Sequence, residues 1–475
     1  MKAIHKRRGW RAAVCTAVAA FTLAAVPGTV AQASVPPKPK PDVTADAVNA
    51  YIYGYSLIMM RATEQASTNV VEPSPATIQA PVNQFANADT INTPDQRVIA
   101  AGNVDTLYSL AWLDLKKEPM VLHLPDTHGR LVMMPMLDAW MNVFASPGTR
   151  TTGSAAGDFA VTAPGWKGRL PAGVTQIKSP TDTVWIVGRT QLDGPSDLPA
   201  VKDLVGQYTL KPLSAHGRDY TPPAGQIDPT VPATNPVDRV AGMDAETYFS
   251  QLASLMATNP PAKEDTPMVA TLARLGIVPG KPFDINARGP ATAEALRQAV
   301  SEGYKQIQNG IPKVTEQVNG WSVNLHLGTY GTDYLLRAVI ALVGIGPNIP
   351  EDAVYMQAFR DGQGNPLNGA NKYVIHFAPG QTPPVNAFWS LTMYDPSGFL
   401  VDNPINRYEV GHNAKPIPNA DGSVDIYIQH DAPAGMESNW LPAPSSGFWV
   451  CLRMYSPQTS VTDGTWTPAA VTVTS

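Results

Sequence analysis

The chain has 475 residues, of which 44% are hydrophobic and 15% are charged, and its formal net charge is −5. This apolar content is enough to bury a core, and the acidic balance disfavours nucleic acid and acidic membrane surfaces as partners. The 46 prolines and 37 glycines favour many short strands and structured loops over long helices throughout.

Residues 1–33 have the pattern of a secretory signal peptide. Five basic residues precede an apolar run from Ala12 to Val26, and small residues lead up to an expected cleavage point at Ala33-Ser34. None of the 39 acidic residues lies in this segment, so cleavage leaves 29 basic residues and a net charge of −10. The apolar run is shorter than the roughly 20 residues that a membrane span needs. We therefore expect a secreted or periplasmic protein without stable membrane insertion.

A helix is expected to begin at a capping Thr44 and to end near Ala66, because its apolar residues follow helical spacing. Short runs with a strand pattern come next, separated by Pro, Gly and Asp turn signals. These runs are Val121–Leu124, Leu131–Met136, Trp140–Phe144, Phe159–Ala163 and Val184–Gly188. They predict an antiparallel β domain.

The segment Leu213–Asp238 is rich in Pro, Gly, Asp and Thr and reads as a long connection. Helical patterns follow it at Asp244–Asn259, Thr266–Gly276, Thr292–Asn309 and Thr332–Val343. From Tyr355 onward the strand pattern returns, with runs at Tyr373–Phe377, Phe388–Tyr394, Val424–Gln429 and Phe448–Tyr455. The order along the chain is therefore β, then α, then β.

The C-terminal strands alternate between apolar and polar residues, which places the two kinds of side chain on opposite faces of a sheet. If these strands are neighbours, one concave face gathers polar and aromatic side chains of the kind that small-molecule pockets use. The residues are His376, Ser390, Thr392, Tyr394, Arg453 and Tyr455. An ordinary solvated sheet face is the competing interpretation.

A second polar cluster spans Gly102–Ser109 and includes Asn103, Asp105 and Tyr108. Asn and Asp here can make turn and capping hydrogen bonds, which is the default interpretation, or they can bind a ligand.

Several long motifs resemble two families of domains of unknown function. Gly102–Ser109, Met136–Asp138 and Asn142–Phe144 resemble the family numbered 1254. The C-terminal motifs resemble the family numbered 1214. These motifs are Pro383–Asp395, Asn406–Tyr408, Asn439–Pro444 and Arg453–Tyr455. The resemblance implies jelly-roll-like β domains accompanied by helices, in exported bacterial proteins, and it brings no agreed chemistry with it.

The expected fold class is therefore α+β, with two antiparallel β-sandwich or jelly-roll-like domains and a helical region between them. The expected boundaries are a signal peptide at 1–33, an N-terminal helix plus β domain at 34–212, a linker and helical region at 213–345, and a C-terminal β domain at 346–475.

The common catalytic signatures of hydrolases, zinc peptidases and nucleotide-binding proteins do not occur in the sequence. His123 and His128 lie five residues apart across a Pro-Asp turn and are interpreted as turn and strand residues, so no metal site is predicted. Cys451, between Val450 and Leu452, is interpreted as a packed strand residue. The sequence identifies no cofactor.

Two functions compete. The first is an enzyme acting on a small or polymeric organic substrate. Its candidate catalytic residues are His376, Asp105, Tyr394 and Asp395. Its candidate substrate-binding residues are Asn103, Tyr108, Trp389, Arg407, Arg453 and Tyr455, where the arginines suit a carboxylate.

The second function is non-catalytic binding of a glycan or an apolar ligand between the β domains, on the indole rings of Trp112, Trp140, Trp389 and Trp449. In a third interpretation the motif residues only join the two β domains, with Arg407 and Asp395 as an ion pair. A homo-oligomer is left open.

Overall fold

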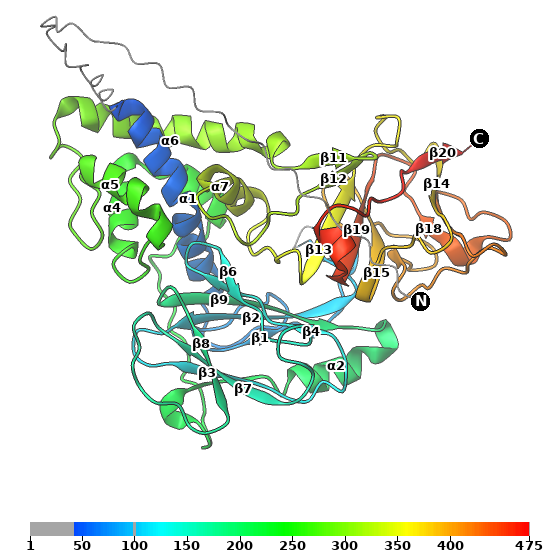
Figure 1. The fold of residues 1–475 in the computed structure, drawn as a ribbon, viewed down its shortest axis with the longest axis horizontal. Coiled ribbons are helices and arrows are strands. Elements are labelled where there is room, and N and C mark those ends of the chain that lie inside the picture. Colours follow the sequence, from blue (N-terminus) through cyan, green and yellow to red (C-terminus); the bar gives the residue numbers. More distant parts are fainter. Residues whose placement is uncertain (1–41, 98–100, 475) are drawn as a thin grey trace, which may run out of the picture. The chain divides into compact units, whose positions relative to one another are not determined.

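The computed structural model describes residues 42–97 and 101–474, so the expected signal peptide at 1–33 lies outside the described residues. From Asp42 onward the described residues cluster as one unit. Figure 1 shows the order of the elements along the chain by colour. No helix in the described part of the chain is both long and apolar enough to cross a membrane.

The first helix, α1 (Val43–Thr68), starts one residue before the expected cap and ends two residues beyond the expected end. Asp42, not Thr44, caps it by accepting hydrogen bonds from the backbone N–H groups of Thr44 and Ala45. The helix is buried along most of its length because five later helices pack around it. These are α3 (Pro236–Ala241), α4 (Ala245–Leu255), α5 (Thr266–Arg274), α6 (Pro290–Gly310) and α7 (Tyr334–Val343).

The N-terminal strands form two sheets with an apolar core between them. The first has the order β1-β2-β9-β5-β6, and β4 also pairs with β9; the second has the order β10-β3-β7-β8. The strands of the first are β1 (Ala86–Asn87), β2 (Thr106–Asp114), β4 (Val132–Met133), β5 (Met136–Asp138), β6 (Val143–Ala145) and β9 (Thr183–Gln191). Those of the second are β3 (Met120–Leu124), β7 (Gly157–Thr162), β8 (Val174–Lys178) and β10 (Thr209–Pro212).

The C-terminal strands repeat this two-sheet plan around a second core. One sheet has the order β11-β12-β13-β19-β15-β16 and the other β18-β17-β14-β20. The strands of the first are β11 (Glu316–Val318), β12 (Trp321–Val323), β13 (Ala353–Ala358), β15 (Val385–Tyr394), β16 (Glu409–Val410) and β19 (Trp449–Pro457). Those of the second are β14 (Lys372–Phe377), β17 (Val424–Gln429), β18 (Trp440–Pro442) and β20 (Thr472–Thr474).

The predicted α+β class, with two sheet-rich parts and helices between them, is confirmed. Parallel pairing occurs between β7 and β8 and between β17 and β18, so two of the sheets are mixed and not purely antiparallel. The domain boundaries at residues 212 and 345 stay a prediction.

The run Trp140–Phe144 was expected to be a strand, and this is wrong for its first half. Trp140 and Met141 form a tight turn between β5 and β6, in which Met141 has a positive φ of 71° and Asp138 accepts the N–H groups of Trp140 and Asn142. Several elements lie outside the predicted runs. They include the strands β2, β8 and β10, the helix α3, which starts inside the expected connection, the helix α2 (Leu198–Val205), and the hairpin of β11 and β12.

The predicted facing of the C-terminal strands is confirmed. On β15, Leu391 and Met393 pack into the C-terminal core, while Ser390, Thr392 and Tyr394 lie on the other face. That other face is buried as well, because it covers the segment from Ala101 to Asp105 of the N-terminal half.

Candidate functional site

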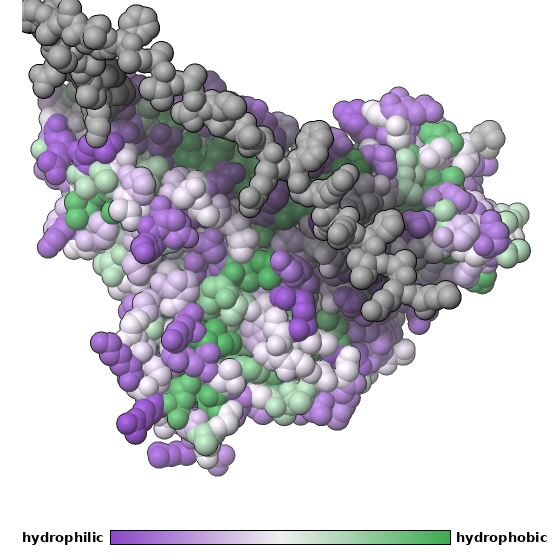
Figure 2. All heavy atoms as spheres, viewed as in Figure 1, coloured by the Kyte–Doolittle hydropathy of each residue, from purple (hydrophilic) through white to green (hydrophobic). Residues whose placement is uncertain are grey.

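A cleft of about 990 Å³ lies where α1, the N-terminal β2 and β9 strands, the end of α7 and the C-terminal β13 and β19 strands meet. This volume is in the upper range of small-molecule pockets. Figure 2 shows hydrophobic residues in green between hydrophilic ones on one face of the molecule. The exposed apolar side chains Ile311, Val343 and Phe359 all line the cleft.

Much of the cleft wall is apolar. Leu110 on β2 and Val187 on β9 contribute to it from the N-terminal sheet, and Trp185 adds an indole that stacks on Trp112 at 4.8 Å between ring centroids. Leu327, Ile340, Val343 and Ile345 extend this surface from the helical part and its loops. An organic ligand that enters the cleft can therefore bury apolar surface.

We call the N-terminal pair of sheets and the C-terminal pair of sheets the two sandwiches. Two arginine–tyrosine pairs also line the cleft, one on each sandwich. Arg189 on β9 lies directly across the sheet from Tyr108 on β2, and its guanidinium sits 5.2 Å from the centre of the Tyr108 ring. Arg453 on β19 lies directly across from Tyr355 on β13, again at 5.2 Å. Each arginine rests on its tyrosine as a cation–π contact.

Asn348, in the loop after α7, connects the two pairs. Its Oδ1 accepts a hydrogen bond of 2.6 Å from Nη1 of Arg189, and its Nδ2 donates one of 3.0 Å to the hydroxyl of Tyr355. Tyr455 lies beside Tyr355 with ring centroids 6.1 Å apart. We call Arg189, Arg453, Tyr108, Tyr355 and Tyr455 the arginine–tyrosine cluster. Because they come from both sandwiches, the cluster exists only when the two are in contact.

Arg453 also links the two halves of the chain. Its Nη2 donates a 2.7 Å hydrogen bond to the carbonyl of Ala101, and its Nη1 donates one of 2.9 Å to the hydroxyl of Thr392. Arg453 is 2% exposed and Arg189 is 6% exposed. Guanidinium groups keep their charge in proteins, so both positive charges are buried beside the cleft.

A pair of buried carboxyl groups lies behind the cluster. Asp105 accepts a 2.5 Å hydrogen bond from the hydroxyl of Ser390, and burial raises the pKa of Asp105 while Ser390 and Arg453 act against that rise. Glu409 on β16 accepts backbone N–H groups at residues 412, 413 and 414, yet burial and the nearby Asp105 raise its pKa to about 8. Glu409 is therefore mostly protonated at neutral pH.

The structure brings six of the predicted site residues together, five of them in or behind the arginine–tyrosine cluster and the sixth, Asn103, hydrogen-bonded to one of these five. Tyr108, Arg453 and Tyr455 belong to the arginine–tyrosine cluster, and Asp105 and Tyr394 lie behind it. Tyr394 donates a 2.7 Å hydrogen bond to the carbonyl of Gly102, and burial raises its pKa. Their catalytic or binding roles stay predictions.

Asn103 holds this arrangement in place. Its Oδ1 accepts the N–H groups of Asp105 and Thr106, and its Nδ2 donates to the hydroxyl of Tyr108 at 3.0 Å. The turn interpretation of residues 102–109 and the site interpretation are therefore compatible, because the same side chain caps the start of β2 and orients a cluster tyrosine.

Other predicted residues lie elsewhere. His376 on β14 is in the outer C-terminal sheet, where its side chain is 55% exposed and its Nδ1 lies 2.6 Å from Asp425, so it does not share the predicted concave face. Trp389 packs on the C-terminal core beside Phe377.

The expected ion pair between Arg407 and Asp395 is also wrong. Arg407 donates to the backbone carbonyls of Glu437, Ser438 and Trp440, while Asp395 pairs with Arg97 at 3.0 Å.

Arg189, Tyr355 and Asn348 were not predicted. The strand pattern of β9 held a usable signal, because Trp185, Val187 and Arg189 share one face and a lone arginine on an apolar face needs an explanation. Asn348 lies in a loop and carries no such pattern.

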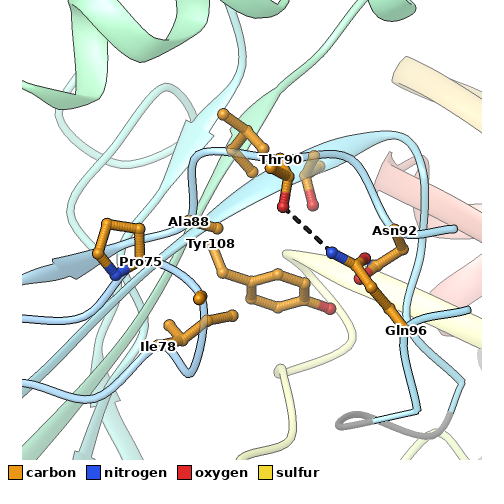
Figure 3. A pocket seen from close by; sticks show the side chains of 10 residues that line it. Pro75, Ile78, Ala88, Thr90, Asn92, Gln96 and Tyr108 are labelled. Atoms are coloured by element: carbon orange, nitrogen blue, oxygen red, sulfur yellow. Dashed lines mark hydrogen bonds between the residues drawn. The ribbon is translucent and has the colours of Figure 1, made fainter.

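A smaller cavity of about 40 Å³ adjoins Tyr108 on the N-terminal side. Figure 3 shows Tyr108 between Ile78 and Thr90, with Gln96 donating a 3.2 Å hydrogen bond to Thr90. Ile78 and Tyr108 line both the small cavity and the cleft. The small cavity has room for little more than water. Within residues 42–97 and 101–474 no cluster of three or more His, Cys, Asp or Glu side chains is placed to hold a metal ion.

Two family models match the chain, in the order that the motifs indicated. The model of the protein family of unknown function DUF1254 matches residues 82–212, and that of DUF1214 matches residues 352–459. The resemblance seen in the sequence is thereby confirmed. No curated protein matches the sequence.

Two solved structures are similar to this chain. The VPA0106 protein from Vibrio parahaemolyticus is 22% identical, with a TM-score of 0.69, and the match covers 91% of this chain and 100% of that one. An uncharacterised protein from Burkholderia cenocepacia is 12% identical, with a TM-score of 0.42 and coverage of 91% and 94%. The first match shows the same fold.

Proposed function

We propose that this protein, which pairs a DUF1254 domain with a DUF1214 domain, binds an apolar organic ligand in the cleft between its two sandwiches. The observation that carries the proposal is the cleft itself, about 990 Å³ in volume and walled by Trp185, Leu110, Val187 and the apolar end of α7. Burial of apolar ligand surface against such a wall is the main source of affinity in small-molecule sites.

The enzyme hypothesis is less well supported by the geometry. It assigns the acid or base role to Asp105 or His376, but Asp105 is 0% exposed behind the cluster and His376 is in the outer C-terminal sheet. The polar side chains that line the cleft include those of Tyr108, Tyr355, Arg189 and Arg453, and they include neither Asp105 nor His376. Action outside the cytoplasm is also part of the proposal, and it rests on the sequence of residues 1–33.

The test uses the neutral fluorescent probe N-phenyl-1-naphthylamine, whose emission rises in apolar surroundings. We expect saturable binding to the protein, competition by decanol, and recovery of the decanol unchanged. Val343→Asp, at the cleft rim, should weaken probe binding about fivefold, because covering this exposed valine with the ligand contributes roughly 1 kcal/mol of apolar contact.

Val473→Asp is the matched control, because Val473 is also an exposed valine and lies on β20, outside the cleft lining. Equal probe binding by the two variants and the wild type would rule out the cleft as the ligand site. Chemical conversion of the decanol would instead favour the enzyme hypothesis.

A further inference from the structure

The two buried arginines beside the cleft have no acidic partner in the chain. Neither Arg189 nor Arg453 forms an ion pair within the described residues, 42–97 and 101–474. All 39 aspartates and glutamates fall within those ranges. No acidic side chain elsewhere in the sequence is therefore left to neutralise them. Buried charges are normally paired, because an unpaired one loses its hydration without compensation.

The hydrogen bonds of the arginines are also incomplete. The Nε atoms of both are buried without a partner among the described residues. The bonds that the guanidinium groups do make go to neutral oxygens, those of Asn348 and Val187 for Arg189 and those of Thr392 and Ala101 for Arg453. These bonds orient the guanidinium groups and leave their charge uncompensated.

The acidic groups nearest to the cluster compensate only part of this charge. Asp105 is buried and hydrogen-bonded by Ser390, and its carboxylate oxygens lie more than 4.0 Å from the guanidinium nitrogens of Arg453, too far for an ion pair. Glu409 is mostly protonated near neutral pH. The cluster therefore carries a net positive charge of one to two.

We infer that the ligand of the cleft is an organic carboxylate whose apolar body lies on the Trp185 wall and whose carboxylate is held between Arg189 and Arg453. This inference rests on the proposed function. A carboxylate suits the site because it is planar and singly charged, and it accepts paired N–H bonds from arginine. The apolar wall beside the arginines favours a molecule with one charged end.

The experiment compares three ligands with the same ten-carbon chain, decanoate, decanol and decyl phosphate, by titration calorimetry near neutral pH. We expect decanoate to bind at least about tenfold more tightly than decanol, because a hydrogen bond to a charged group adds that much affinity. Arg189→Met should abolish the preference, because it should weaken the binding of decanoate much more than that of decanol. Arg189→Lys should keep part of it, because Lys retains the charge without the bidentate geometry.

Arg169→Met is the control, because Arg169 is an exposed arginine of the same sandwich outside the cleft lining. Tight decanol binding without a preference for decanoate would overturn the carboxylate assignment and leave the proposed function standing. A preference that survives in Arg189→Met would also overturn it, as would tighter binding of decyl phosphate. If none of the three ligands binds, the proposed function fails and this inference fails with it.

Discussion

The buried carboxyl group of Glu409 should make the free energy of unfolding depend on pH. Its folded-state pKa is about 8, well above the ordinary glutamate value of 4.5, because it is buried near Asp105. The folded state therefore holds a proton that the unfolded state releases between these two values. The resulting stabilisation is complete below the unfolded pKa and is lost as the pH rises through the folded pKa.

We expect the free energy of unfolding to fall by on the order of 2–4 kcal/mol between about pH 5 and about pH 8 from this group. Glu409→Gln should remove that part of the fall, because the amide does not titrate. Urea unfolding at several pH values measures it. Glu316→Gln, at an exposed position on β11, is the control. Parallel curves for the two variants would mean that Glu409 is ionised in the folded protein.

For individual residues, the sequence predicted part of the site. Alternation along β15 and β19 placed Tyr394, Arg453 and Tyr455 on one face correctly, since side-chain direction in a strand follows from position alone. The same reasoning failed for His376, because alternation gives the face of a strand but not the sheet to which that strand belongs. Arg189 was missed because the predicted run ended at Gly188, whereas β9 continues to Gln191.

Among the elements, the contact between α1 and α6 depends on a glycine. A Cβ atom on Gly303 of α6 would lie 2.5 Å from Cδ1 of Tyr51 on α1. The Tyr51 ring cannot move aside easily, because it is stacked on Tyr248 at 4.4 Å and is fully buried. The two helices can therefore lie this close only with glycine at 303.

Gly303→Ala should destabilise the protein by about 1–3 kcal/mol, although alanine is the better helix former by about 1 kcal/mol. Ser301→Ala, on the exposed face of the same helix, should change stability by less than about 0.5 kcal/mol. The denaturant midpoints of the two variants and the wild type measure these changes in stability. Stabilisation by Gly303→Ala would show that the helices are farther apart than the structure places them.

Element types were predicted best where a pattern was long or regular. The helices at Thr266–Arg274 and Tyr334–Val343 and the strand Val424–Gln429 agree closely with their predicted ranges. The hairpin of β11 and β12 was missed because each strand has three residues, which is too short for a period to show. The Trp140 turn was taken for a strand because its large apolar residues are buried by packing of the helical part.

The arrangement of the whole described part could not be read from the sequence. We grouped the first helix with the N-terminal β domain because it precedes it, yet α1 packs at the centre of helices that come some 170 to 290 residues later. Contacts over such separations depend on which faces fit one another, and periodicity carries no information on that. The cleft is a consequence of this arrangement, since its walls come from all three parts of the chain.

Buried hydrogen bonds and two small apolar clusters join the two sandwiches, and this contact should behave as one cooperative surface. The hydroxyl of Tyr394 donates to the carbonyl of Gly102, and the hydroxyl of Ser390 donates to the carboxylate of Asp105. The guanidinium of Arg453 donates to the carbonyl of Ala101. All three come from one face of the C-terminal sheet and end within five consecutive residues of the N-terminal half. Loss of one of these bonds leaves a buried oxygen without its hydrogen-bond donor, which costs about 1–3 kcal/mol.

Tyr394→Phe should therefore speed amide hydrogen exchange in peptides covering residues 101–114 and 385–394 by about tenfold, and leave α1, α4 and α6 unchanged. Tyr427→Phe is the control, since Tyr427 lies on β17 in the outer sheet and its hydroxyl makes no hydrogen bond within the described part of the chain. Faster exchange spread equally over the helices would mean that the residue stabilises the fold as a whole. A change confined to the two peptides would show that the sandwiches separate locally, and because the arginine–tyrosine cluster draws on both of them, that opening would also take the cluster apart.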